Sequence, residues 1–383
     1  MSEPTQEFQF SEDLIALREM VREFCQEMSP ESAVRSAMES ESGYDAALWR
    51  RLGSELGVFG LAVPESLGGD DAGLVAQAIL FEEMGAALVC GPVVGTLALA
   101  VPALCALSDI GAAAPHLAGA MSGDTVLTLA APIGDGVFVA EDATVSATTS
   151  EGTWTLHGVA THVADGMAAD AALIAARTSD GIALFLVDTA DPGLTRTALT
   201  TMDLTRRQAQ YELKDVVGVR VADEIETPAV CEYAARVGAV LIAAEQVGGS
   251  QAMLDRTVDH AKNRLQFGQA IGAFQAVKHK CADMLMAVEQ ARSVAYHGAW
   301  AIQDDTDDPR LAASLARAVA SETYFRTTAT AIQLHGGTGF TWEYPAHLYF
   351  KRAVADSAVL GSAERHYELI AEQALDAPVV GAV

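Results

Sequence analysis

The feature that most constrains this chain is a glycine-bearing turn between two long segments with helical spacing, Cys231–Asn263 and Ala273–Asp304. The turn, RLQFGQAIGAFQ, runs from Arg264 to Gln275 and contains Phe267 and Gly268. The backbone N–H groups of such a turn, with a guanidinium beside them, suit a phosphate group. An arginine there can also simply complement the C-terminal dipole of the helix. We expect an anionic ligand at this junction of two helices.

A second glycine cluster closes a later helical segment. It reads QLHGGTGF, and its candidate ligand-binding residues are Gln333, His335, Gly336, Gly337 and Gly339. Glycine lets the backbone approach a flat or anionic ligand because no Cβ stands in the way. A helix stop also uses glycine, but it requires fewer than three. We therefore expect this second turn to contact a ligand too.

Hydrophobic periodicity divides the chain into three parts and predicts an α+β fold. Residues 1–123 have mainly helical spacing, residues 124–223 alternate with a period of two, and residues 224–383 are helical again. The predicted parts are a helical amino-terminal domain, a middle antiparallel β-barrel or sandwich, and a carboxyl-terminal four-helix bundle. The predicted strands are Thr125–Ala130, Val137–Ala140, Thr144–Thr148, Thr153–Gly158, Ala171–Arg177 and Ile182–Asp188.

Two apolar patterns describe the predicted core. Ala312, Ala316 and Ala320 recur every fourth residue, so a neighbouring helix can approach closely there. A second stripe, which includes Leu285, is predicted to be buried along the segment after the turn. The apolar stretch Gly85–Leu107 is long enough for a membrane span, but prolines and glycines interrupt it, so two buried core helices are favoured.

Composition limits the partners of the chain. Its formal net charge of −27 excludes nucleic acid and anionic membrane surfaces as expected partners, because both would repel it. The five cysteines are scattered and lack metal-ligand spacing, so no metal site is expected. They are typical of reduced thiols in a cytoplasmic protein, and the acidic start is not that of a signal peptide.

The two turns, in this order and spacing, resemble those of the acyl-CoA dehydrogenase family. The resemblance also covers the amino-terminal helix and the PESLGG turn at Pro64–Gly69. It implies FAD as cofactor and an acyl-CoA thioester, fatty, branched or steroid, as substrate. In the family the R-x-x-F-G turn and the Q-x-x-G-G-x-G turn of one subunit close over the FAD of its neighbour. A homo- or hetero-oligomer, dimer or tetramer, is therefore implied, and an electron-transfer flavoprotein is a further partner left open.

The resemblance also reveals departures at the catalytic positions. Family members lift the α-proton of the substrate with a glutamate placed at one of two positions, and here those positions hold Leu360 and Gly238. Where the family sets a tryptophan and a threonine against the flavin, this chain has His162 and Ala164. His162 can still stack on or hydrogen-bond to a flavin, or it is a surface residue on a strand.

Glu245 is the remaining candidate for the catalytic base. It lies two helical turns after Gly238 and therefore on roughly the same helix face. The alternative is that Glu245 pairs with a basic neighbour, because a charged residue in an apolar helix is seldom buried without a partner. The paired arginines in TMDLTRR, Thr201–Arg207, are interpreted as part of an exposed loop, or as groups facing an anionic ligand.

Two functions follow from these residues. The first is FAD-dependent α,β-dehydrogenation of an acyl-CoA thioester, in lipid or steroid side-chain β-oxidation, with Glu245 as base. The second is a non-catalytic partner subunit that completes the FAD site of a homologous chain with Arg264 and the 333–339 turn. The missing glutamates favour the second function, and Glu245 keeps the first open.

Overall fold

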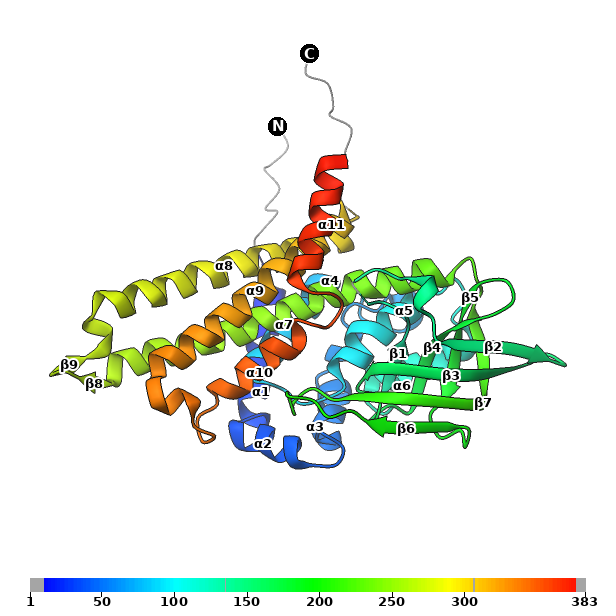
Figure 1. Cartoon of the computed structure of the whole chain (residues 1–383), viewed down its shortest axis with the longest axis horizontal. Coiled ribbons are helices and arrows are strands. Elements are labelled where there is room, and N and C mark those ends of the chain that lie inside the picture. Colours follow the sequence, from blue (N-terminus) through cyan, green and yellow to red (C-terminus); the bar gives the residue numbers. More distant parts are fainter. Residues whose placement is uncertain (1–9, 135, 306, 377–383) are drawn as a thin grey trace, which may run out of the picture.

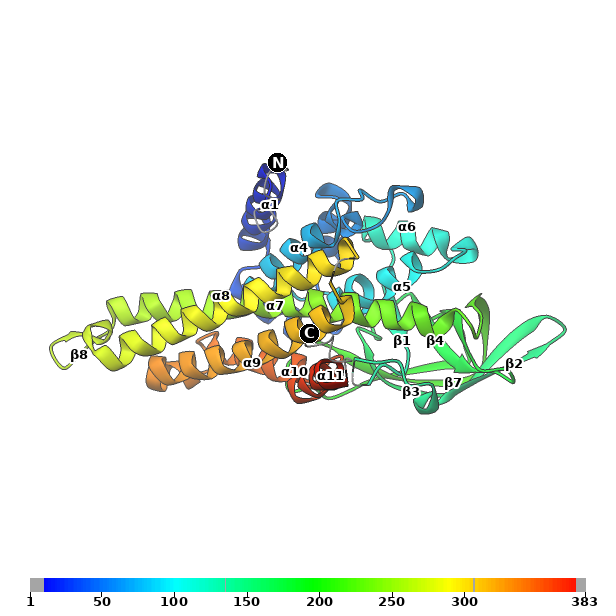
Figure 2. The same cartoon turned by 90° about the horizontal axis from the view of Figure 1, so that it is seen from above.

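The structure is a computed structural model, and it describes residues 10–134, 136–305 and 307–376. A helical part, a β-sheet part and a second helical part follow one another along the chain, which confirms the predicted fold class (Figure 1). The sheet lies at one end of an elongated molecule and a small hairpin lies at the other, with the long helices between them (Figures 1 and 2).

The amino-terminal part is helical, as predicted. Its α-helices are α1 (Glu12–Met28), α2 (Glu31–Glu39), α3 (Ala46–Arg50), α4 (Leu74–Ala86), α5 (Val101–Cys105) and α6 (Ala114–Ser122). Ser11 is the N-cap of α1, because its Oγ accepts a hydrogen bond from the Leu14 N–H. The apolar stretch Gly85–Leu107 forms the end of α4, a buried π-helix, Val93–Ala100 (η4), and α5. It is core, as favoured from the sequence.

The middle part is a seven-stranded sheet that closes on itself. Its order is β1-β4-β2-β3-β7-β5, β5 pairs back with β4, and β6 pairs with β7. Most pairs are antiparallel, as predicted for this barrel or sandwich, while β1 and β2 each run parallel to β4. The strands are β1 (Leu127–Ala130), β2 (Val145–Ser150), β3 (Thr153–Ala164), β4 (Ala171–Arg177), β5 (Ile182–Asp188), β6 (Leu194–Ala198) and β7 (Gln208–Ala222).

The carboxyl-terminal bundle contains three long helices and two short ones. They are α7 (Thr227–Asn263), α8 (Gln275–Gln303), α9 (Pro309–His335), α10 (Ala346–Asp356) and α11 (Ala363–Asp376). The predicted alanine seam is buried on α9, and Ala316 meets α8 at Gly298, where an added Cβ would lie 3.3 Å from the Ala316 Cβ. The prediction for Leu285 was wrong, because this side chain is 50% exposed on α8.

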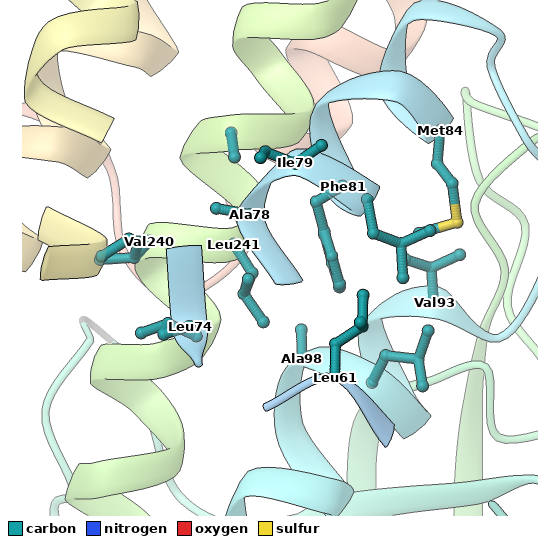
Figure 3. Packing of buried hydrophobic residues seen from close by; sticks show 14 of the residues in the cluster. Leu61, Leu74, Ala78, Ile79, Phe81, Met84, Val93, Ala98, Val240 and Leu241 are labelled. Carbon is teal, nitrogen blue, oxygen red and sulfur yellow. The ribbon is translucent and has the colours of Figure 1, made fainter. Parts of the chain in front are cut away.

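The core lies where α7 crosses the amino-terminal helices. Figure 3 shows side chains of α4, η4 and α7 packed together, among them Phe81, Ala98 and Leu241. By length and composition α7 could cross a membrane, but 72% of its most apolar window is buried inside the protein. Helix α7 runs from the sheet end of the molecule to the hairpin end (Figures 1 and 2).

Candidate functional site

The Arg264 turn is a tight hairpin at the far end of the bundle. Strands β8 (Leu265–Gln266) and β9 (Gln269–Ala270) pair, and the two residues between them, Phe267 and Gly268, have φ of 52° and 79°. Two successive positive φ angles are what a two-residue hairpin requires. The Ile271 N–H donates to the Arg264 carbonyl at 2.9 Å and closes the turn. The side chains of Arg264 and Phe267 are exposed, and Phe267 is 91% exposed.

The second glycine cluster forms a 3₁₀ turn, Gly336–Phe340, directly after α9. Gly336 has a φ of 59°, and a Cβ added to Gly336 or Gly337 would meet nothing within 4 Å. Their backbone is therefore open to a ligand. Gly339 serves packing instead, because a Cβ there would lie 2.8 Å from both the His335 Cβ and the Ile332 carbonyl oxygen.

Contacts between the helices that carry them place these two turns at the same end of the bundle, although about seventy residues separate them in the sequence. The His260 ring, one helical turn before Arg264, lies against the His335 ring with centroids 4.3 Å apart. Lys280 Nζ donates to Gln333 Oε1 at 2.7 Å, and Gln275 is exposed at the start of the same helix, α8. We call the β8–β9 hairpin and the Gly336–Phe340 turn the bundle tip.

His335 supports the bundle tip from inside. The ring is buried, with Nδ1 donating to the Ala331 carbonyl at 2.7 Å and Nε2 accepting from the Tyr344 hydroxyl at 2.6 Å. Burial lowers the pKa of His335, and burial together with the adjacent His335 and Arg264 lowers that of His260. Both rings are therefore neutral at pH 7. Through these two hydrogen bonds His335 holds the glycine turn, and its predicted contact with a ligand stays a prediction.

Glu245 lies in a buried ion-pair network. Arg206 Nη2 donates to both of its carboxylate oxygens at 2.6 Å, and Arg352 Nη1 donates to Oε1. The side chain is 3% exposed, and although burial acts to raise its pKa, the two guanidinium groups outweigh it and lower the pKa. A carboxylate held by two arginines is a weak proton acceptor. This geometry favours the ion-pair alternative for Glu245 over the catalytic role.

The network includes residues that the sequence analysis interpreted differently. Asp203 and Arg206, assigned to an exposed loop, are buried, and Arg352 Nε donates to Asp203 Oδ2 at 3.0 Å. Asp356 completes it, with Oδ1 3.3 Å from Arg206 Nη2. We call these five residues the arginine–carboxylate cluster: Asp203, Arg206, Glu245, Arg352 and Asp356. The one local signal for it is the spacing of Arg352 and Asp356, four residues apart on α10.

The two positions that the family uses for its glutamate meet in space in this chain. Leu360 is 6% exposed, and a Cβ on Gly238 would lie 2.9 Å from Leu360 Cδ1 and 3.0 Å from the Ala98 carbonyl oxygen. Leu99 Cδ2 would follow at 3.1 Å. We call the contact between Gly238 and Leu360 the base position. It is filled by apolar side chains and leaves no room for a longer residue at 238.

A cavity of about 500 Å³ lies beside the base position, between the sheet and the bundle. His162, at a bulge of β3 with a φ of 57°, lines it with Ala164, Arg206 and Leu360. In the part of the chain that the structure describes, Asp142 is the one carboxylate among the lining residues, and it is exposed. The stretch Leu129–Gly134 borders the same cavity, and Asp135 lies outside the described residues.

The chain belongs to the acyl-CoA dehydrogenase family. The family model for the acyl-CoA dehydrogenase N-terminal domain matches residues 11–114, and the model for the C-terminal domain matches residues 229–375. The resemblance found in the sequence is thereby confirmed.

Individual relatives cover nearly the whole chain. Acyl-CoA dehydrogenase IpdE2 of Mycolicibacterium smegmatis is 36% identical over 351 residues, which are 92% of this chain and 95% of the relative. Among solved structures, the ChsE4-ChsE5 complex from Mycobacterium tuberculosis is 29% identical with a TM-score of 0.86, covering 97% of this chain and 100% of that chain. A variant of the Tcur3481-Tcur3483 steroid ACAD is 29% identical with a TM-score of 0.84, covering 95% and 98%.

Proposed function

We propose that this chain is the cofactor-completing subunit of a hetero-oligomeric, FAD-dependent acyl-CoA dehydrogenase. A homologous partner chain carries out α,β-dehydrogenation of the acyl-CoA thioester, and this chain supplies its bundle tip to the FAD of that partner. The observation that carries the proposal is the base position, where Leu360 packs against Gly238 and no carboxylate is present. Two solved relatives named as pairs of different proteins support a hetero-oligomer.

The residues at the bundle tip fit the pyrophosphate of FAD. Arg264 offers an exposed guanidinium, which binds phosphate through paired, charge-assisted hydrogen bonds. Gly336 and Gly337 offer an exposed backbone with open space where a side chain would stand. Phe267 offers an exposed ring on the hairpin. These groups point away from the chain that carries them, so the ligand they contact lies against a second subunit.

The chemistry of the family needs two groups, and within the described residues the positions that the family uses for the second one hold no carboxylate. FAD, when bound, accepts the hydride from the β-carbon of the substrate. A carboxylate must remove the α-proton, and its pKa must be close enough to the working pH for that transfer. Leu360 cannot accept a proton, and Glu245 is held between two arginines with a lowered pKa. Asp142 is exposed and belongs to a turn of the sheet part.

The exposed apolar side chains support a partner interface. Large apolar side chains are exposed on the described bundle, among them Leu285 and Met286 on α8, Phe325 on α9, and Phe340 at the end of the glycine turn. Obligate interfaces are rich in such residues and bury more than roughly 2,000 Å². The unexpected exposure of Leu285 thus has an explanation, because the predicted buried stripe is completed by another chain.

The proposal also includes a substrate class, which we infer from the name of one solved relative. One solved relative is named a steroid ACAD, so we propose an acyl-CoA thioester with a bulky lipid or steroid side chain rather than a short straight one. A panel of acyl-CoA thioesters from short straight chains to steroid side chains, given to the assembled complex, ranks them by turnover. Fastest turnover of a short straight chain contradicts this part.

Co-expression with a homologous chain encoded beside it tests the assembly. Size-exclusion chromatography with mass measurement and the flavin absorbance give the composition and the FAD content per chain. We expect a mixed oligomer with one FAD for each pair of chains, because the cavity of this chain contributes no second active site. A stable homo-oligomer with one FAD for each chain contradicts the proposal.

A further inference from the structure

We propose that Arg352 is a positioning residue for the glycine turn at the bundle tip. The arginine–carboxylate cluster fixes α10 through Arg352, and α10 in turn fixes the turn Gly336–Phe340 that precedes it. This inference rests on the proposed function, because the turn is the part of this chain that contacts the cofactor of the partner. It assigns a role to the buried charges that the chemistry of the family does not use.

Arg352 is tied to its surroundings through every nitrogen of its guanidinium. Nε donates to Asp203 Oδ2 and to Thr205 Oγ1, both at 3.0 Å, and Nη1 donates to Glu245. Nη2 donates to the Thr205 carbonyl at 3.1 Å and to Thr205 Oγ1 at 2.7 Å. The partners come from the segment between β6 and β7 and from α7. Because the planar guanidinium has this many fixed hydrogen-bond acceptors, α10 can adopt one rotation about its axis and one position along it.

The position of α10 passes to the glycine turn over a short distance. Tyr344, two residues before α10, donates to His335 Nε2 at 2.6 Å, and His335 is the last residue of α9. This bond closes the loop that contains Gly336 and Gly337. At the first turns of α10, the Tyr349 hydroxyl donates to the Ala86 carbonyl at 2.7 Å. A shift of α10 therefore moves Tyr344 and changes the shape of the open turn.

The segment that holds Arg352 is itself held by the rest of the molecule. Thr205 N–H and Oγ1 donate to Asp203 Oδ1 at 2.9 Å and 2.6 Å. Arg207 Nη2 donates to the carbonyls of Met38 and Ser40 near α2, at 2.7 Å and 3.3 Å. The cluster is thus a fixed reference point between the sheet part, the amino-terminal helices and the bundle.

Simple stabilisation is a weak reason for such a cluster. Burying charged groups is costly, and well-packed apolar residues often give equal stability, whereas ionic groups fix one geometry. The other large ion-pair network of the described chain offers a comparison. There Arg292 of α8 pairs with Glu82 and donates to Gln251 Oε1 at 2.7 Å, but it contacts neither α10 nor the bundle tip.

The test compares Arg352→Lys with Arg292→Lys in the purified, FAD-containing oligomer. Each change keeps the charge and removes the planar fork. FAD dissociation constants and thermal midpoints are measured together, with hydrogen exchange of the backbone at residues 336–345. We expect Arg352→Lys to weaken FAD binding roughly tenfold, the lower end of what losing a supporting partner costs at metal sites. Arg292→Lys should lower the thermal midpoint by a similar amount but change FAD binding by no more than about twofold, since Arg292 does not support the glycine turn.

Thr205→Val is a second variant, because it removes an acceptor of Arg352 without changing any charge. It should weaken FAD binding and raise exchange at residues 336–345 in the same direction. Equal effects of Arg352→Lys and Arg292→Lys on FAD binding overturn the inference. Unchanged FAD binding in both Arg352→Lys and Thr205→Val overturns it as well. Arg264→Ala tests the proposed function separately. If it leaves FAD binding unchanged, the proposed function is wrong, and so is this inference, which rests on it.

Discussion

The bundle tip and the base position differ in how much space they leave. At the tip, a Cβ added to Gly336 or Gly337 would meet nothing within 4 Å, and Arg264 and Phe267 are exposed on the hairpin. At the base position, Leu360 packs so closely that Gly238 has no room for a Cβ. The bundle tip is open, and the base position is closed.

This difference shows how a subunit can be specialised without a change of fold. Closing the base position requires only apolar residues of the right size, while the open tip requires glycines and an arginine at fixed places. The family members with which the chain shares its fold have the same order of parts. Function is therefore decided by a few side chains rather than by the architecture.

The largest expected effect comes from Glu245→Gln. Loss of this charge leaves Arg206 and Arg352 facing each other in the core, so the free energy of unfolding should fall by about 3–5 kcal/mol. Chemical denaturation measures it, and Glu322→Gln, which removes a surface carboxylate paired with Arg326 on α9, is the control. If Glu245→Gln is as stable as the parent but inactive in the complex, Glu245 is a catalytic base after all.

The next effect is the loss of cofactor binding in Arg264→Ala. A charge-assisted contact with a phosphate contributes about 1.5–3 kcal/mol, so FAD binding to the oligomer should weaken while the helical signal stays unchanged. Lys262→Ala removes a cation from the last turn of α7, outside the hairpin, and serves as the charge-matched control. Equal losses in both variants would mean that general electrostatic attraction, and not the turn, holds the cofactor.

A smaller effect is expected from Gly238→Ala. The added Cβ meets the Ala98 carbonyl and Leu360, and overpacking of this kind costs about 1–3 kcal/mol, less up to about 1 kcal/mol gained in helix propensity. Leu360→Ala should relieve the clash with the side chain, so the double variant should be more stable than the sum of the single effects predicts. Strict additivity in denaturation would show that the two residues do not touch.

The smallest expected effect is on the pH dependence of the free energy of unfolding. Burial raises the pKa of Asp356 to about 6, from an ordinary value of 3.8. Its contribution to stability is therefore fully present below pH 3.8 and is lost as the pH rises through about 6. Glu245, whose pKa is lowered from 4.5, acts in the opposite direction and loses its contribution below that pH. Asp356→Asn should flatten the dependence of unfolding free energy on pH between 4.5 and 6; an unchanged slope would contradict the assignment.

Local sequence patterns predicted the features that depend on neighbours in the chain. Helical spacing located α7, α8 and α9, the glycines located both turns, and counting along the family motifs located Gly238 and Leu360. Each of these rests on periodicity or on a motif that acts within a few residues. Strands β6 and β7 were missing from the predicted set, although β7 alternates between buried and exposed positions along most of its length.

Contacts between distant segments could not be predicted in the same way. Arg352 meets Asp203 across 149 residues and Glu245 across 107, and nothing in the local pattern of TMDLTRR indicates burial. Leu285 fits a buried stripe by spacing, yet whether a stripe is covered depends on which helix lies beside it. The parallel pairing of β1 with β4 likewise depends on the path of the chain and not on strand composition.

The most direct test of the account is bleaching of the flavin absorbance by an acyl-CoA thioester under anaerobic conditions. The measurement is made on this chain alone, reconstituted with FAD, and on the co-expressed complex. The account predicts that the complex bleaches on addition of substrate and that the chain alone does not, since its base position holds Leu360. Substrate-dependent bleaching by this chain alone would contradict the central claim that its own half of the site is closed.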